Sequence, residues 1–123
     1  MASILVVEKD RSVRDYVKLH LESVNHSVSL ASNHADGLEI VQTWSPALVF
    51  ADLDIAKTRG YDFLEAIRSN PASAPTPVIL LSEDVDPSVL EESTRRGAKD
   101  CLFKPINRQE LLDAASGQLD KGD

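Results

Sequence analysis

Acidic, hydroxyl and ammonium side chains directly follow the short apolar runs of this 123-residue chain. A carboxylate can accept a phosphoryl group when cations hold that group in place, and a hydroxyl or an ammonium can bind a phosphate oxygen. Neighbouring acids repel by about 3 kcal/mol per pair at about 6 Å and an effective dielectric of 20, so a cation is expected among them. The residues concerned are Glu8, Lys9, Asp10, Asp52, Asp54, Ser82, Glu83 and Lys104.

The elements that must position these side chains are indicated by the alternation of short apolar runs with longer amphipathic stretches. This alternation predicts five strands and five helices in a single domain covering residues 1–123. The strands are expected at 4–7, 28–31, 48–51, 78–81 and 101–103. The helices are expected near 12–24, 34–44, 61–69 and 87–96, and from Asn107 to Leu119.

Helix-terminal signals support these boundaries. Ser12 and Asp15 have capping-box spacing at the start of the first helix. Pro87 suits the first position of the fourth helix, and Gly97 suits its end. Asn107 is a suitable cap for the last helix.

The order of the strands follows from their patterns. The first, third and fourth runs are apolar throughout, as in strands covered on both faces, whereas 28–31 alternates and suits a sheet edge. The short run 101–103 suits the other edge. Right-handed crossovers then favour the order 2-1-3-4-5, a doubly wound, flavodoxin-like α/β sheet with helices on both faces. Ligands of such sheets bind beyond the carboxyl ends of the strands.

At that edge Asp52 is the candidate nucleophile, and Ser82 and Lys104 are candidate ligands of a phosphate. Each residue alone also has an ordinary explanation: a turn for Asp52, a cap for Ser82 and a surface charge for Lys104. Three strands that bring an acid, a hydroxyl and an ammonium to one edge favour a shared site. Lys104 is expected to serve the phosphate rather than the core, so that its loss leaves the fold intact.

Composition limits the possible partners. The net charge is −7 and the pI about 4.9, so direct binding of nucleic acid or of an anionic membrane is not expected. Apolar runs are far shorter than the roughly 20 residues of a membrane span, and no secretory signal is recognisable, which predicts a cytoplasmic protein. Cys101 is the only cysteine and the three histidines are scattered, so neither a disulfide nor a zinc site is expected.

Five motifs in order resemble the receiver domain of response regulators, and the resemblance covers the whole chain. It implies that Asp52 aligns with the phosphoacceptor, Ser82 with the switch hydroxyl and Lys104 with the lysine of the family pattern. A receiver takes its phosphate from a histidine kinase or a phosphotransfer protein and shifts between two conformations. The motifs are ILVVEKD at 4–10, PALVFADLD at 46–54, Gly60 with FL at 63–64 and IR at 67–68, PVILLS at 77–82 and GAKDCLFKPI at 97–106.

The metal site implied by this resemblance is Mg²⁺ held by Glu8, Asp52 and Asp54, through a side chain or the backbone, with Asp10 as a weaker candidate. Lys9 stands where the family has a second acid that ligates the metal. An ammonium at this position predicts weak Mg²⁺ binding, unless its flexible stem carries it out to solvent. A helix cap for Asp10 and a loop charge for Asp54 are equally good interpretations.

Three further positions depart from the family pattern. Ala56 replaces the usual proline, and Arg59 replaces the usual acid before a glycine; both are expected in a loop. Cys101 replaces a frequent aromatic residue, so an aromatic switch coupled to Ser82 is not expected there. A buried, structural cysteine is the favoured interpretation.

Output is expected, by the same resemblance, through a face built from the helix 87–96, the strand 101–103 and the last helix. This face could bind an output domain, a partner protein or a second copy of the chain, although a solvated surface is the simpler interpretation of each charge. Its charged residues are Arg95, Arg96, Lys99, Asp100 and Arg108.

Alternative functions follow from the same residues. A pseudo-receiver would keep the fold for protein binding without phosphorylation, which Lys9 favours. A metal-dependent enzyme is a second alternative, because Glu8 with Asp52 and Asp54 resembles the acids of toprim domains, and Asp-x-Asp also opens haloacid-dehalogenase phosphatases. Toprim domains place glycine after the glutamate, and those phosphatases are longer, so the leading prediction is a signalling module rather than an enzyme. Flavin binding is disfavoured because acids would repel its phosphate.

Overall fold

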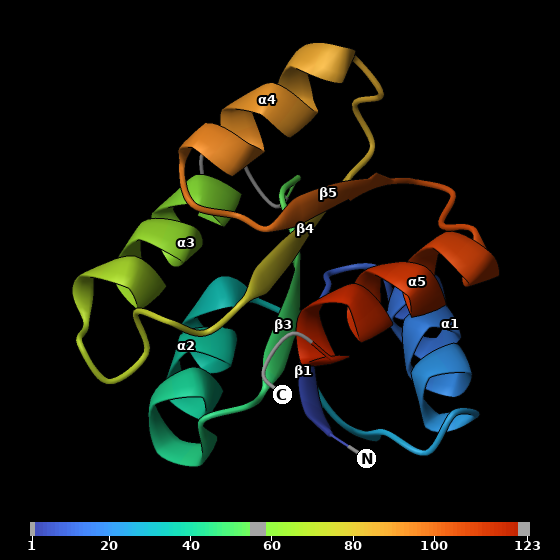
Figure 1. Ribbon diagram of the computed structural model, residues 1–123, viewed down its shortest axis with the longest axis horizontal. Helices are drawn as coiled ribbons and strands as arrows, with labels where there is room; N and C mark the ends of the chain where they lie inside the picture. Colours follow the sequence, from blue (N-terminus) through green and yellow to red (C-terminus); the bar gives the residue numbers. More distant parts are fainter. Residues whose placement is uncertain (1, 55–58, 121–123) are drawn as a thin grey trace.

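The computed structural model describes residues 2–54 and 59–120, in which strands and helices alternate along the chain (Figure 1). The strands are β1 (Ser3–Val7), β2 (Ser27–Ala31), β3 (Leu48–Asp52), β4 (Val78–Ser82) and β5 (Asp100–Phe103). The helices are α1 (Arg11–Glu22), α2 (His34–Trp44), α3 (Arg59–Ser69), α4 (Pro87–Arg95) and α5 (Arg108–Leu119).

The strands form one parallel sheet in the order β2-β1-β3-β4-β5, as predicted. β3 and β4 are buried at every position, whereas the edge strand β2 is buried only at Ala31. In the register of the sheet Asp52 lies beside Leu81, so the end of β3 and the end of β4 reach the same edge. The topology therefore brings the predicted site residues together.

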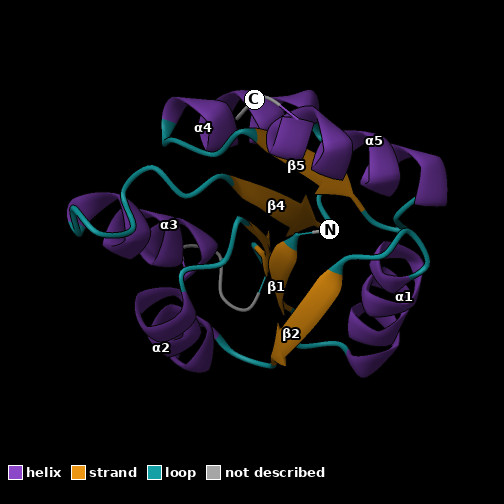
Figure 2. Ribbon diagram, turned by 60° about the horizontal axis from the view of Figure 1, so that its bottom comes forward, coloured by secondary structure: helices purple, strands orange, loops and turns teal. Residues whose placement is uncertain are grey.

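Helices cover both faces of the sheet (Figure 2). Strand residues Ile4 and Val6 pack with side chains of α1 and α5, and Leu5 and Val7 pack with side chains of α2 and α3. Alternate residues of one strand point to opposite faces, so a fully apolar β1 is what this double cover requires. Cys101 is buried, as predicted.

The start of α1 differs from the prediction. Asp10, not Ser12, is its N-cap, because Asp10 Oδ1 accepts hydrogen bonds from the N–H groups of Ser12 and Val13. Asp15 therefore has no capping-box role. The helix also ends at Glu22, before Val24, which is 40% exposed instead of lying on the buried face.

The other helix ends follow their signals closely. Asp86 caps α4 ahead of Pro87, Gly97 follows with a φ of 107°, and Asn107 caps α5. Arg59 is the first residue of α3 rather than part of a loop, and Ala56 lies outside the described residues.

Within the ranges 2–54 and 59–120, no helix combines the length and the apolar character needed to span a membrane.

Helix α2 packs closely against the end of β1, next to the residues of the site. A Cβ atom at Gly37 would lie 2.6 Å from Val7 Cγ2 and 3.4 Å from Phe63 Cε1. Val7 is fully buried and immediately precedes Glu8. Only glycine allows this approach without displacing the end of β1.

We predict that Gly37→Ala lowers the free energy of unfolding by about 1–3 kcal/mol, because the added methyl group overpacks the α2–β1 contact. Gly117→Ala is the matched control, since Gly117 lies in α5 with nothing within 4 Å of the added Cβ. This control should raise the free energy of unfolding by up to about 1 kcal/mol. Urea denaturation of both variants measures the difference, and equal effects would contradict the packing argument.

Candidate functional site

Two buried carboxylates and one ammonium form the centre of the site. Glu8 follows β1, Asp52 ends β3 and Lys104 follows β5. Lys104 Nζ lies 2.9 Å from Glu8 Oε1 and 3.2 Å from Asp52 Oδ1. Both carboxylate side chains are 0% exposed and that of Lys104 is 9% exposed. The predicted convergence of Asp52 and Lys104 is therefore present.

The electrostatic state of this centre depends on burial and on Lys104. Burial raises the pKa of Glu8 above its ordinary value. Burial also acts to raise the pKa of Asp52, but the N–H of Asp54 and the ammonium of Lys104 outweigh it and hold that pKa below its ordinary value. Burial acts to lower the pKa of Lys104, yet its two carboxylate partners raise it overall. Asp52 is consequently ionised at neutral pH.

Asp54 connects the ends of β3 and β4. Its N–H donates a 2.8 Å hydrogen bond to Asp52 Oδ1, and its Oδ2 accepts a 2.6 Å hydrogen bond from the N–H of Glu83. Asp54 Oδ2 also lies 3.9 Å from Lys104 Nζ. Burial raises the pKa of this carboxyl. Asp54 is thus part of the cluster rather than a free loop charge.

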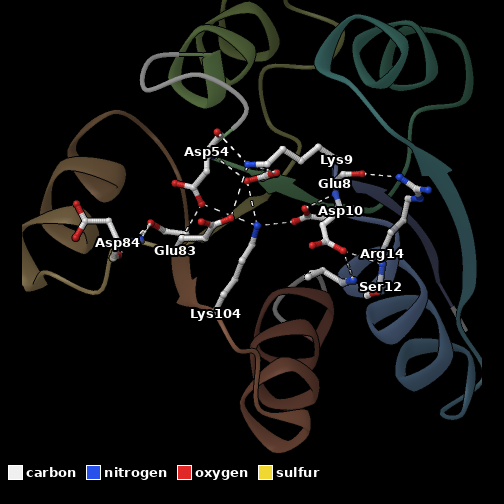
Figure 3. A network of polar contacts seen from close by, with 12 residues as sticks. Glu8, Lys9, Asp10, Ser12, Arg14, Asp54, Glu83, Asp84 and Lys104 are labelled. Atoms are coloured by element: carbon white, nitrogen blue, oxygen red, sulfur yellow. Dashed lines mark hydrogen bonds and ion pairs between the residues drawn. The ribbon is translucent and has the colours of Figure 1, made fainter.

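Lys9 turns into the cluster instead of extending away from it. Its Nζ donates a 3.0 Å hydrogen bond to the carbonyl oxygen of Asp54 and lies 3.7 Å from Asp52 Oδ2 and 3.8 Å from Glu83 Oε1. Figure 3 shows Lys9 and Lys104 reaching the same group of oxygens from different sides. The Lys9 side chain is 41% exposed, so it contacts these oxygens from the solvent side.

Ser82 lies at the same edge but its hydroxyl is used locally. Ser82 is fully buried, and its Oγ donates a 3.0 Å hydrogen bond to the carbonyl of Asp84 and accepts a 3.1 Å hydrogen bond from the N–H of Asp84. The hydroxyl therefore stabilises the turn after β4. A contact with a group on Asp52 would require the hydroxyl to give up these hydrogen bonds.

Asp10 caps helix α1, which is a different role from that of the metal ligand expected from the sequence. Its carboxylate is engaged in capping α1, and its own N–H donates a 2.9 Å hydrogen bond to Glu8 Oε2. Arg14, one turn into α1, donates to the carbonyl oxygen of Glu8 at 2.9 Å. These contacts tie the start of α1 to the buried Glu8.

His34 is a site residue that the sequence does not reveal. Its Nε2 lies 2.8 Å from the carbonyl oxygen of Asp52, and its ring stacks on Phe63 with centroids 5.1 Å apart. A histidine in the first turn of a helix gives no signal of its own. Only the position of α2 beside the end of β3 could have indicated this contact.

The family model of the response regulator receiver domain matches residues 4–116. The chain belongs to this family. Receiver domains are modules of two-component signalling rather than typical enzymes, aspartate phosphorylation is typical of them, and they typically bind Mg²⁺ in the acidic pocket.

Relatives of this receiver domain support the assignment. It is 32% identical over 109 residues, 89% of its length, to the transcriptional regulatory protein DltR of Streptococcus agalactiae, and 32% identical over 117 residues, 93% of its length, to AfsQ1 of Streptomyces coelicolor. It spans only about half of these two proteins, 48% and 49% of their lengths. The crystal structure of the chemotaxis response regulator CheY4 of Vibrio cholerae is 26% identical, with a TM-score of 0.88 and coverage of 97% and 99% of the two chains.

The family's Mg²⁺ is not a good fit to the side chains present here. Glu8 faces Lys104, Asp10 caps α1 and the Asp54 carboxylate accepts a hydrogen bond from the N–H of Glu83, so three of the four acids expected at the metal are already engaged. Among the described residues no three acidic, histidine or cysteine side chains are grouped to hold a metal ion. The ammonium groups of Lys9 and Lys104 lie 3.7 Å and 3.2 Å from the two oxygens of Asp52, so a divalent cation bound there would be repelled by both.

Lys104 is the shared cation of two fully buried carboxylates, so we expect its loss to affect stability as well as any phosphate contact. We predict that Lys104→Ala lowers the free energy of unfolding at pH 7 by about 3 kcal/mol, because it leaves two fully buried carboxylates without their shared cation. The loss should shrink as the pH falls toward the pKa of Asp52, since a protonated carboxyl needs no ammonium.

Denaturation by urea at several pH values tests this prediction, with Lys99→Ala as the control at an exposed lysine on the opposite edge of the sheet. Adding Asp52→Asn to Lys104→Ala should recover part of the loss. A pH-independent loss, or one matched by Lys99→Ala, would show that the charge compensation is unimportant.

Proposed function

We propose that this receiver domain accepts a phosphoryl group on Asp52 from a histidine kinase or a phosphotransfer protein. The observation that carries the proposal is the state of Asp52: a fully buried, ionised carboxylate between two ammonium groups. Oδ1 accepts hydrogen bonds from Asp54 and Lys104, whereas Oδ2 receives none from the described residues. Oδ2 is therefore the oxygen available for a new bond.

The transfer forms a bond between Asp52 Oδ2 and the phosphorus while the bond from phosphorus to the donor atom breaks. The electron pair of the broken bond stays with the donor, and Asp52 loses no proton because it is already ionised. The product is an acyl phosphate with additional negative charge next to Lys104. Lys104 would bind one phosphoryl oxygen, and Ser82 would bind another if its turn opens.

Response regulators interact with histidine kinases and with output domains, and we propose the α4–β5–α5 face as the output surface of this chain. Arg95 at the end of α4 and the C-cap residue Arg96 are paired with Glu92, and the Arg96 guanidinium lies 4.6 Å from the centre of the Tyr61 ring. Arg108 instead contacts His20 of α1. A partner protein or a second copy of the chain would bind at α4, and the cytoplasm is the expected compartment.

A pseudo-receiver is the second candidate function, and the contacts of Lys9 are the observation that favours it. With Lys9 paired to Asp54 and Asp52, the domain would keep a fixed, unphosphorylated conformation for protein binding. The toprim-like and haloacid-dehalogenase interpretations lose their basis, since the family match covers residues 4–116 and Glu8 is paired with Lys104.

We predict that incubation with a small acyl phosphate adds one phosphoryl mass to the protein and that Asp52→Asn abolishes this addition, because the amide oxygen is a poor nucleophile. Intact-mass measurement, followed by fragment mapping, detects the label. Asp15→Asn, on the exposed surface of α1, is the matched control and should remain fully labelled.

Labelling of Asp52→Asn at the wild-type level would refute Asp52 as the acceptor. An unlabelled wild-type protein, both with the small donor and with a phosphorylated donor protein, would favour the pseudo-receiver.

A further inference from the structure

Three oxygen atoms, from the end of β3 and from the segments that follow β3 and β4, lie within 4 Å of the Lys9 ammonium. They are the carbonyl oxygen of Asp54 at 3.0 Å, Asp52 Oδ2 at 3.7 Å and Glu83 Oε1 at 3.8 Å. Of these, Asp52 Oδ2 is buried and receives no hydrogen bond from the described residues. A carbonyl and two carboxylates are hard oxygen ligands of the kind that Mg²⁺ selects. Here they are directed at a side chain of the protein itself.

We propose that the Lys9 ammonium is a tethered counter-ion that takes the place of the divalent cation in this acidic pocket. The proposal rests on the proposed function, because it assigns Lys9 a role at the phosphoacceptor. It also accounts for the poor fit of Mg²⁺. The ion and the ammonium compete for the same oxygens, so the pocket binds Mg²⁺ only when Lys9 moves away.

The competition is unequal because Lys9 is covalently held at the site. Its backbone follows β1, where the N–H of Glu8 is fixed by the carbonyl of Ala31 at 3.0 Å. The ammonium is therefore present at a high effective concentration, whereas Mg²⁺ must come from solution and shed part of its water shell. An incoming ion would also meet the positive charge of Lys104, which is held in place by Glu8.

For phosphoryl transfer, the two ammonium groups of Lys9 and Lys104 would together do what a metal ion and a lysine do in a typical receiver domain. Lys104 approaches Asp52 Oδ1 and Lys9 approaches Asp52 Oδ2, so a phosphoryl group on Oδ2 would be flanked by Lys9. The Lys9 side chain is 41% exposed, which leaves it room to shift outward as the phosphoryl group enters. Transfer from the donor would then need no divalent ion.

Calorimetric titration with Mg²⁺ alone tests the competition without relying on phosphorylation. Four proteins are compared: the wild type, Lys9→Asp, Lys9→Ala and Lys99→Asp. We expect Lys9→Asp to bind Mg²⁺ at least about tenfold more tightly than the wild type, and Lys9→Ala to be intermediate because it removes the ammonium and adds no ligand. Lys99→Asp makes the same change in net charge at an exposed residue on the opposite edge of the sheet. It should match the wild type.

Two titration results would overturn the proposal. Equal affinities of the wild type and Lys9→Ala would mean that the ammonium does not compete with the ion. Equal gains in Lys9→Asp and Lys99→Asp would mean that net charge, rather than occupancy of the pocket, sets the affinity. Lys9→Ala keeps the test decisive if the more acidic Lys9→Asp fails to fold, which circular dichroism would reveal.

A second measurement separates this proposal from the proposed function. The wild type and Lys9→Asp are incubated with a small acyl phosphate, either with Mg²⁺ or with a chelator, and the added mass is measured. We expect the chelator to leave labelling of the wild type unchanged and to slow that of Lys9→Asp. Labelling of the wild type that requires Mg²⁺ would overturn the counter-ion role. No labelling under any condition, together with none from a phosphorylated donor protein, would refute Asp52 as acceptor, and the titration would still decide on Lys9.

Discussion

The constraint on which this structure depends is the burial of two carboxylates, Glu8 and Asp52, at the carboxyl edge of a parallel sheet. Removal from water and mutual repulsion both disfavour such a pair, and only a nearby cation makes it tolerable. Lys104 provides that cation with its ammonium 2.9 Å and 3.2 Å from the two acids. The ends of β1, β3 and β5 are thereby joined, so the integrity of the edge and the chemistry of the site depend on the same contacts.

Most of the fold could be predicted because its determinants are local and periodic. The alternating pattern of 28–31 identified the edge strand, and the fully apolar runs identified the strands covered on both faces. The start of α1 could not be settled in this way. Asp10 and Ser12 are both good capping residues, and the choice depends on the N–H of Asp10 reaching Glu8, a contact that exists only after the chain folds.

The candidate site was predictable as a set of positions but not as a set of contacts. Topology alone places Asp52 and Lys104 at one edge, since parallel strands end together. It does not determine where a long or rotatable side chain points. Lys9 turns toward Asp54 rather than toward solvent, and the Ser82 hydroxyl turns toward Asp84 rather than toward Asp52. His34 depends on the packing of α2 against Phe63.

The two lysines differ in burial, and this difference suggests how one pocket can be both stable and responsive. Lys104 is almost fully buried between two acids, so displacing it would expose them to each other at a high energetic cost. Lys9 holds its oxygens from the solvent side, through one hydrogen bond and longer ion pairs that water weakens. Of the two lysines, Lys9 is therefore the one whose shift costs less energy when Asp52 gains a group, while Lys104 stays between its acids. Lys9 is in turn connected to the segment after β4: its ammonium binds the carbonyl oxygen of Asp54, and Asp54 Oδ2 accepts a hydrogen bond from the N–H of Glu83. The same segment contains the Ser82–Asp84 contacts and the N-cap of α4, Asp86.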